Sequence, residues 1–201
     1  MTTLLPVLER ESRRRNLAAA DETLTAATCF TLIRDMPYRR ASSRQPEAII
    51  REWQGTCSGK HYALHQIFGE LGLGCRVIMC THRFTRDNTL HFPVELRALV
   101  EREPVPDVHT CVKLETDRGL MVVDATWPSS AAPLGMPVNR HFEAGRDMTI
   151  ACDPIDTYEV PAGQDPQVFK ERLIEEFCGA SSQVRDDFIE GMGRWLSHAA
   201  G

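Results

Sequence analysis

The fold is decided by residues 55–77, GTCSGKHYALHQIFGELGLGCRV, where a helical pattern changes to an extended one. Five apolar residues recur at the spacing of one helical face and predict a helix over residues 58–71. They are Tyr62, Leu64, Ile67, Phe68 and Leu71. Gly72 and Gly74 follow, as expected where a helix ends in a left-handed residue. The short β-branched run at 75–80 then predicts a buried strand.

Two further strands follow and favour a hairpin. Residues 108–115 and 120–126 are rich in apolar and β-branched side chains, and TDRG at 116–119 has the composition of a tight turn. The 27 residues from 81 to 107 are too many for a routine connection. We expect a functional or mobile segment there, with one short helix starting at Pro93.

Helical signals continue on both sides of this central part of the chain. The second predicted helix begins at Asp21, a good N-cap residue, and is stopped by Pro37. Helices, then strands, then helices again indicate an α+β fold. The flanking helices are predicted over residues 4–18, 21–35, a short segment from Pro46, 166–178 and 181–198.

Length and composition bound the possible functions. The chain has 201 residues, 42% hydrophobic and 25% charged, which is typical of one globular domain. We therefore expect a single domain over residues 1–201, with extra helices at both termini. Basic residues number 23 against 28 acidic ones, and the only basic cluster is at 13–15. Nucleic acid is therefore not an expected partner.

The seven cysteines, an odd number, exclude a complete disulfide framework. The N-terminus lacks the apolar region of a secretory signal, and no stretch approaches the ~18 apolar residues of a membrane span. We expect a cytoplasmic protein with reduced thiols and no membrane contact. His61 and His65 could share a metal-binding face with Cys57, but the Glu of His-Glu-x-x-His is missing and no CxxC pair occurs. No metal and no other cofactor is expected.

Three residues supply the groups that thiol catalysis needs: Cys57, His109 and Asp124. Cys57 precedes a helix, and the partial positive charge of a helix N-terminus favours a thiolate. A histidine base beside the sulfur, oriented by an acid, completes such an arrangement. Gln54 offers an amide donor for an oxyanion, and Trp127 is a candidate for the core or for the wall of the substrate pocket.

The hairpin tests whether these residues can meet. With a loop of two or four residues, paired positions sum to 235, so Cys111 faces Asp124 and His109 faces Thr126. His109 and Asp124 are then diagonal neighbours on one face of the hairpin. The other face would carry core residues, and a three-residue loop without a bulge would invert the arrangement. The core residues are Val112, Leu114, Met121 and Val123.

Several segments share the pattern of one known family. They are IRDMPY at 33–38, GTCSG at 55–59, LGLGCRV at 71–77, HTCVKL at 109–114 and VVDATWP at 122–128. Over about residues 32–128 the chain thereby resembles the transglutaminase-like superfamily. The resemblance implies a papain-like core, with the helix that bears the nucleophile packed on a small antiparallel sheet. It also implies that Cys57 is the nucleophile, His109 the base and Asp124 the orienting acid.

The chain departs from the family pattern at two positions near these residues. Ser58 stands where the family often has an aromatic residue, and Cys111 stands where it often has Trp. These departures leave the acyl donor open. The related arylamine N-acetyltransferases typically carry Arg-Gly-Gly-x-Cys-x-Glu, and the Arg and Glu of that pattern are missing around Cys57.

Residues and resemblance together favour a cysteine-nucleophile acyl-transfer enzyme that hydrolyses an amide or peptide bond in a small molecule or peptide. One alternative is acyl transfer to an amine, as in transglutaminases or arylamine N-acetyltransferases. A second alternative is a non-enzymatic interaction domain on the same fold. The C-terminal helical extension, residues 165–198, could pack on the core or provide the face of a homodimer.

Overall fold

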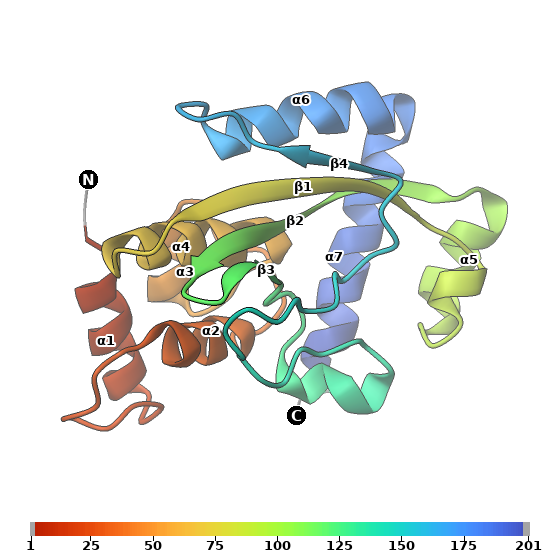
Figure 1. Ribbon diagram of the computed structural model, residues 1–201. Coiled ribbons are helices and arrows are strands. Elements are labelled where there is room, and N and C mark those ends of the chain that lie inside the picture. The colour runs from red at the N-terminus through yellow and green to blue at the C-terminus, as the bar shows by residue number, and fades with distance from the viewer. Residues whose placement is uncertain (1–2, 199–201) are drawn as a thin grey trace.

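A four-stranded antiparallel sheet in the order β3-β2-β1-β4 forms the centre of the molecule (Figure 1). The computed structural model describes residues 3–198. With helices before and after the strands, it confirms the α+β class. The strands are β1 (Cys75–Phe84), β2 (Val105–Thr116), β3 (Gly119–Val123) and β4 (Asp156–Glu159).

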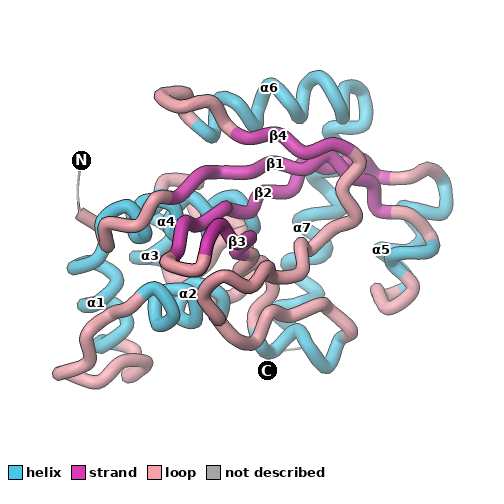
Figure 2. The backbone as a smooth tube through the Cα atoms, viewed as in Figure 1, coloured by secondary structure: helices cyan, strands magenta, loops and turns pink. Residues whose placement is uncertain are grey.

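Along the chain, helices come before the first strand, between the strands and after the last strand. Figure 2 shows that the chain between β3 and β4 is mostly loop, interrupted by one short helical segment. The α-helices are α1 (Leu5–Arg14), α2 (Ala26–Arg34), α3 (Pro46–Glu52), α4 (Cys57–Glu70), α5 (Val94–Arg102), α6 (Pro166–Cys178) and α7 (Ser182–His198). The short 3₁₀ helices are η1 (Asp87–Thr89), η2 (Ser129–Leu134) and η3 (Gly179–Ser181).

Helices α4 and α6 both contribute to the main hydrophobic core on one face of the sheet. Phe68 of α4 and Phe169 of α6 join the same buried cluster as Val112 of β2. The first eight residues of α4, from Cys57 to Leu64, are all buried. Helix α4 is therefore a central helix, enclosed on all sides where it begins, and its first residue has a fixed position.

The hairpin has the register that places His109 and Asp124 on one face. Val112 pairs with Val123 and Thr116 pairs with Gly119, so a two-residue loop joins the strands. The prediction that paired positions sum to 235 is thus confirmed, and the four predicted core residues are buried. The last pair between β2 and β3 is Val112 with Val123. At His109, the side of β2 that faces away from β1 therefore has no neighbouring strand, and other groups can approach it there.

Helix boundaries near the N-terminus differ from the prediction. Helix α2 begins at Ala26 and not after Asp21, because the Thr25 hydroxyl accepts the Thr28 backbone N–H and caps the helix there. Helix α1 ends at Arg14, two residues before Asn16, whose φ of 57° is incompatible with a continuing helix.

The predicted long connection is partly strand. β1 continues to Phe84 and β2 begins at Val105, because the two strands stay paired along their whole length regardless of polar residues such as His82. The short helix predicted from Pro93 is present as α5. Strand β4 was not predicted, since its residues DTYE are all exposed and show no apolar alternation.

The C-terminal helices pack on the core. Among the residues described, no helix is long and apolar enough to cross a membrane. Six apolar residues of α6 and α7 are buried against the rest of the chain. These side chains therefore belong to the hydrophobic core and do not form an exposed face. They are Phe169, Leu173, Phe188, Ile189, Met192 and Leu196.

Two glycines of α4 form a matched pair that tests this packing. A Cβ at Gly59 would lie 2.4 Å from Ile49 Cδ1, whereas a Cβ at Gly69 would meet nothing within 4 Å. We predict that Gly59→Ala lowers the free energy of unfolding by about 1–3 kcal/mol through overpacking. Gly69→Ala should raise it, by up to about 1 kcal/mol, through helix propensity. Urea denaturation of both variants checks this.

The companion variant Ile49→Val removes the Cδ1 atom that would clash. The combined Gly59→Ala and Ile49→Val variant should recover part of the loss relative to Gly59→Ala alone. Equal changes in stability for Gly59→Ala and Gly69→Ala would contradict the close packing of α3 on α4.

Candidate functional site

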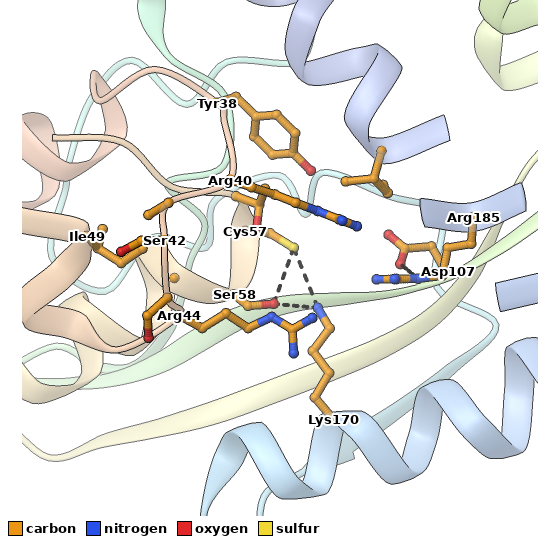
Figure 3. Close-up of a pocket in the computed structure, with 15 residues that line it drawn as sticks. Tyr38, Arg40, Ser42, Arg44, Ile49, Cys57, Ser58, Asp107, Lys170 and Arg185 are labelled. Atoms are coloured by element: carbon orange, nitrogen blue, oxygen red, sulfur yellow. Dashed lines mark hydrogen bonds and ion pairs between the residues drawn. The ribbon is translucent and has the colours of Figure 1, made fainter. Parts of the chain in front are cut away.

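Cys57 is the first residue of α4 and lies at the base of a cleft of about 210 Å³ (Figure 3). Its side chain is only 6% exposed. Thr56 precedes it as the N-cap residue without a side-chain capping bond. The backbone N–H groups of the first helical turn have no partner within the helix. The sulfur therefore lies where a helix N-terminus offers positive charge and free donors.

His109 and Asp124 form a buried pair next to this cysteine. His109 Nε2 and Asp124 Oδ2 are 2.8 Å apart. The carboxylate also accepts the backbone N–H groups of Thr126 at 3.0 Å and of Ala151 at 2.9 Å. Since Nε2 of the imidazole is used by Asp124, Nδ1 is the nitrogen available for the side-chain hydrogen bond to Cys57.

The charges at the site favour a thiolate and an imidazolium. Burial by itself raises the pKa of the Cys57 thiol, but the charge of Lys170 and the hydrogen bond and charge of His109 together lower it to about 6. Burial lowers the pKa of His109, but the charge and hydrogen bond of Asp124, followed by Cys57, raise it to about 10. Between these two pH values the pair is ionised, which is the reactive form of such a site.

His61 connects helix α4 to the segment that carries Asp124. Its Nε2 accepts the Ala125 backbone N–H at 2.8 Å, so Nδ1 carries the proton and donates to the Cys57 carbonyl at 2.7 Å. Burial lowers the pKa of His61 to about 4, so this ring is neutral at physiological pH. Both ring nitrogens are occupied, and the side chain sets the spacing between Cys57 and Asp124.

Lys170 of α6 completes the site and was not predicted from the sequence. It is 1% exposed, and its ammonium donates to the Ser58 hydroxyl at 2.7 Å and the Thr110 hydroxyl at 3.0 Å. The ammonium also lies 3.7 Å from the Cys57 sulfur. Figure 3 shows the Lys170 ammonium, the Ser58 hydroxyl and the Cys57 sulfur meeting in front of β2. Lys170 thus supplies a second cation to the thiolate, in addition to His109.

A weak signal for Lys170 exists in the sequence. The lysine precedes Leu173, Ile174 and Phe177 by three, four and seven residues, so it is in phase with an apolar helical stripe. A lysine on such a stripe is normally read as a side chain that reaches to solvent. Only the docking of α6 against β2 reveals that it ends at the cysteine.

A second charged group borders the cleft beside Lys170. Arg185 Nε donates to Asp107 Oδ1 at 2.6 Å, and His82 Nε2 lies 3.4 Å from Asp107 Oδ2. All three side chains are buried. Burial raises the pKa of Asp107, but the Arg185 charge and the His82 hydrogen bond outweigh it and hold the pKa well below its usual range. Asp107 is therefore an anion already balanced by its own partners.

The two residues expected beside the reacting atoms lie elsewhere. The Gln54 side-chain amide donates to the Arg40 carbonyl at 2.8 Å, and Gln54 does not line the cleft. Trp127 lies behind Tyr38, with ring centroids 4.8 Å apart, and borders a separate hollow of about 280 Å³. Its buried Nε1 has no hydrogen-bond partner. Gln54 instead supports the segment that carries Arg40.

The other cysteines are free thiols outside the cleft. Cys80 and Cys111 belong to one small buried cluster, and Cys152 packs against it. Cys111 fills the position where the resemblance led us to expect Trp. Within residues 3–198 no group of three or more His, Cys, Asp or Glu side chains is arranged to hold a metal ion.

Comparison of the chain with protein-family models, with curated proteins and with solved structures found no match. The chemistry of the site is therefore argued from its own residues and geometry.

Proposed function

We propose that the chain is a cysteine-dependent acyl-transfer enzyme that hydrolyses an amide or peptide bond through an acyl-enzyme. One arrangement carries this proposal. A cysteine at a helix N-terminus lies beside a histidine that lowers the pKa of its thiol, and one ring nitrogen of that histidine is held at 2.8 Å by a buried carboxylate. These are the nucleophile, base and orienting group of a thiol triad. The arrangement is also the one that a papain-like, transglutaminase-like core would present.

The first half of the reaction uses the ionised pair directly. The Cys57 thiolate attacks the carbonyl carbon, a C–S bond forms, and the carbonyl π electrons move to oxygen. The N–H groups at the start of α4 stabilise this oxyanion. When the intermediate collapses, His109 donates its Nδ1 proton to the leaving amine and the C–N bond breaks. Asp124 holds the imidazole in the orientation this transfer needs.

The second half regenerates the thiolate. Neutral His109 takes a proton from water, whose oxygen attacks the thioester carbon. The C–S bond then breaks, the carboxylic acid leaves, and Cys57 returns to a thiolate between His109 and Lys170.

Hydrolysis is preferred over transfer to an amine because water needs no second binding site. The free thiols at all seven cysteines support a reducing, cytoplasmic location.

Acylation by an activated ester tests the proposed function. With p-nitrophenyl acetate, we predict a burst of one p-nitrophenolate per chain, together with one acetyl group on the peptide that contains Cys57. Mass spectrometry of the digested protein locates the acetyl group. Cys57→Ala should abolish both signals, because it removes the nucleophile.

The matched control is Cys75→Ser, which changes a partly buried cysteine outside the cleft. It should leave the burst unchanged. An acetyl group spread over several cysteines, or a burst that survives Cys57→Ala, would contradict the proposal. If added amines capture the acetyl group faster than water does, the reaction is transfer and not hydrolysis.

The pH dependence of Cys57 alkylation tests the role of Lys170. In the unaltered protein, the rate with iodoacetamide should fall as pH decreases through about 6, because the thiolate becomes protonated there. Lys170→Met removes a cation 3.7 Å from the sulfur and should raise this midpoint by about 1–3 pH units. Lys170→Arg, which keeps the charge, should move it less.

Lys113→Met is the control, since Lys113 lies on β2 outside the cleft. Its midpoint should stay near that of the unaltered protein. A circular dichroism spectrum like that of the unaltered protein shows that Lys170→Met is folded. A midpoint that does not change in Lys170→Met would show that Lys170 has only a packing role.

A further inference from the structure

The cleft above Cys57 is lined by more positive than negative side chains. Arg40, Arg44, Lys170 and Arg185 border it, together with one carboxylate, Asp107. In Figure 3 the guanidinium groups of Arg40 and Arg44 extend into the cleft from the segment after Tyr38, and Lys170 reaches the sulfur from α6. A substrate entering this cleft therefore meets an excess of positive charge.

These four cations differ in how firmly they are balanced. Arg185 is buried, donates to Asp107 at 2.6 Å and also contacts Asp186 at 2.8 Å. Arg40 contacts Asp186 at 2.7 Å, and Arg44 contacts Glu171 at 3.4 Å. All four side chains of these two pairs are between 36% and 57% exposed, and neither acid lines the cleft. Exposed pairs of this kind contribute little and are readily exchanged for a better partner. Arg40 and Arg44 can thus exchange these exposed acids for a ligand.

Lys170 loses the thiolate beside it during the proposed reaction. Its ammonium contacts two hydroxyl groups and the Cys57 sulfur. When the thiolate becomes a thioester and His109 gives up its proton, the sulfur and the imidazole are both neutral, and Lys170 keeps Asp107 as its anionic neighbour. A negative charge on the acyl group would restore an anion close to this buried ammonium.

We propose that the acyl donor carries a carboxylate, which Arg44 and Arg40 bind at the rim of the cleft, above Lys170. This inference rests on the proposed function, because it names the substrate class of the same site. A guanidinium group binds a carboxylate through two parallel hydrogen bonds. The negative charge that the sulfur loses on acylation is a single unit, which a monoanionic carboxylate replaces better than a phosphate dianion does.

Two alkylating reagents of similar size separate the effect of the reagent's charge from the reactivity of the Cys57 thiolate. Iodoacetate carries a carboxylate and iodoacetamide carries its neutral amide, and both modify a thiolate. We expect the ratio of their rates at Cys57, iodoacetate over iodoacetamide, to exceed the ratio for free glutathione by about tenfold or more at low salt. Mass spectrometry of the peptide with Cys57 gives both rates.

Variants of the two arginines at the rim of the cleft test whether these residues cause the preference for iodoacetate. Arg44→Gln and Arg40→Gln should each lower the rate ratio several-fold, because each removes a guanidinium group that binds the carboxylate. Arg146→Gln makes the same charge change at a residue that is 77% exposed and outside the cleft, and should have no effect. If the Arg44 and Arg40 variants keep the full preference for iodoacetate, binding of the carboxylate by these arginines is overturned.

Protection by small anions distinguishes the kinds of oxyanion. Glutarate should slow iodoacetamide alkylation of Cys57 at lower concentration than inorganic phosphate does, and neutral glutaramide should not protect. Stronger protection by phosphate would overturn the assignment to a carboxylate.

The two proposals fail in different ways. If Cys57 reacts rapidly near neutral pH but shows no preference for iodoacetate, the proposed function stands and the carboxylate inference is wrong. If Cys57 reacts slowly with both reagents, with the pH profile of an ordinary thiol, the proposed function is contradicted and the inference falls with it.

Discussion

The hydrogen bond between Asp124 and His109 is the constraint on which the rest of the site depends. Asp124 follows β3 directly, and its carboxylate accepts from His109, Thr126 and Ala151. Its pKa is held well below its usual range because the His109 charge and hydrogen bond outweigh burial. A buried carboxylate with this set of donors stays ionised and fixes the ring of His109 in turn. The same loop binds α4 through His61, which places Cys57 on the other side of the imidazole.

Burial has opposite effects on the groups of this site, and their mutual charges decide the outcome. Each of Cys57, His109 and Lys170 would lose its charge if it were buried alone. Together they form a compact set of two cations and two anions, with Asp124 as the second anion. Lys170 gives the thiolate of the resting site a second cationic neighbour in addition to His109. Helix α6, which carries Lys170, is therefore part of the site and not only a cover for the sheet.

The sequence predicts the hairpin and the pairing of His109 with Asp124 well, because both follow from local patterns. Alternation of side chains and a two-residue turn determine that His109 and Asp124 share a face. Lys170 lies 113 residues beyond Cys57, and no local pattern shows where α6 docks. Strand β4 could not be predicted because its four residues are all exposed and show no apolar pattern. It forms a strand by pairing with β1. Gln54 was placed at the oxyanion by chemistry alone, whereas the fold directs its amide to Arg40.

The protonation state of His109 tests the central claim most directly, because an ionised Cys57 and an ionised His109 require each other. Nitrogen-15 NMR of the imidazole, assigned by its loss in His109→Gln, follows this ring alone as pH is varied. With Asp124 and the thiolate beside it, the ring should remain an imidazolium at pH 8 and lose its proton only near pH 10. An imidazole that is already neutral at pH 8, with a pKa close to the ordinary value of about 6.5, would contradict the account.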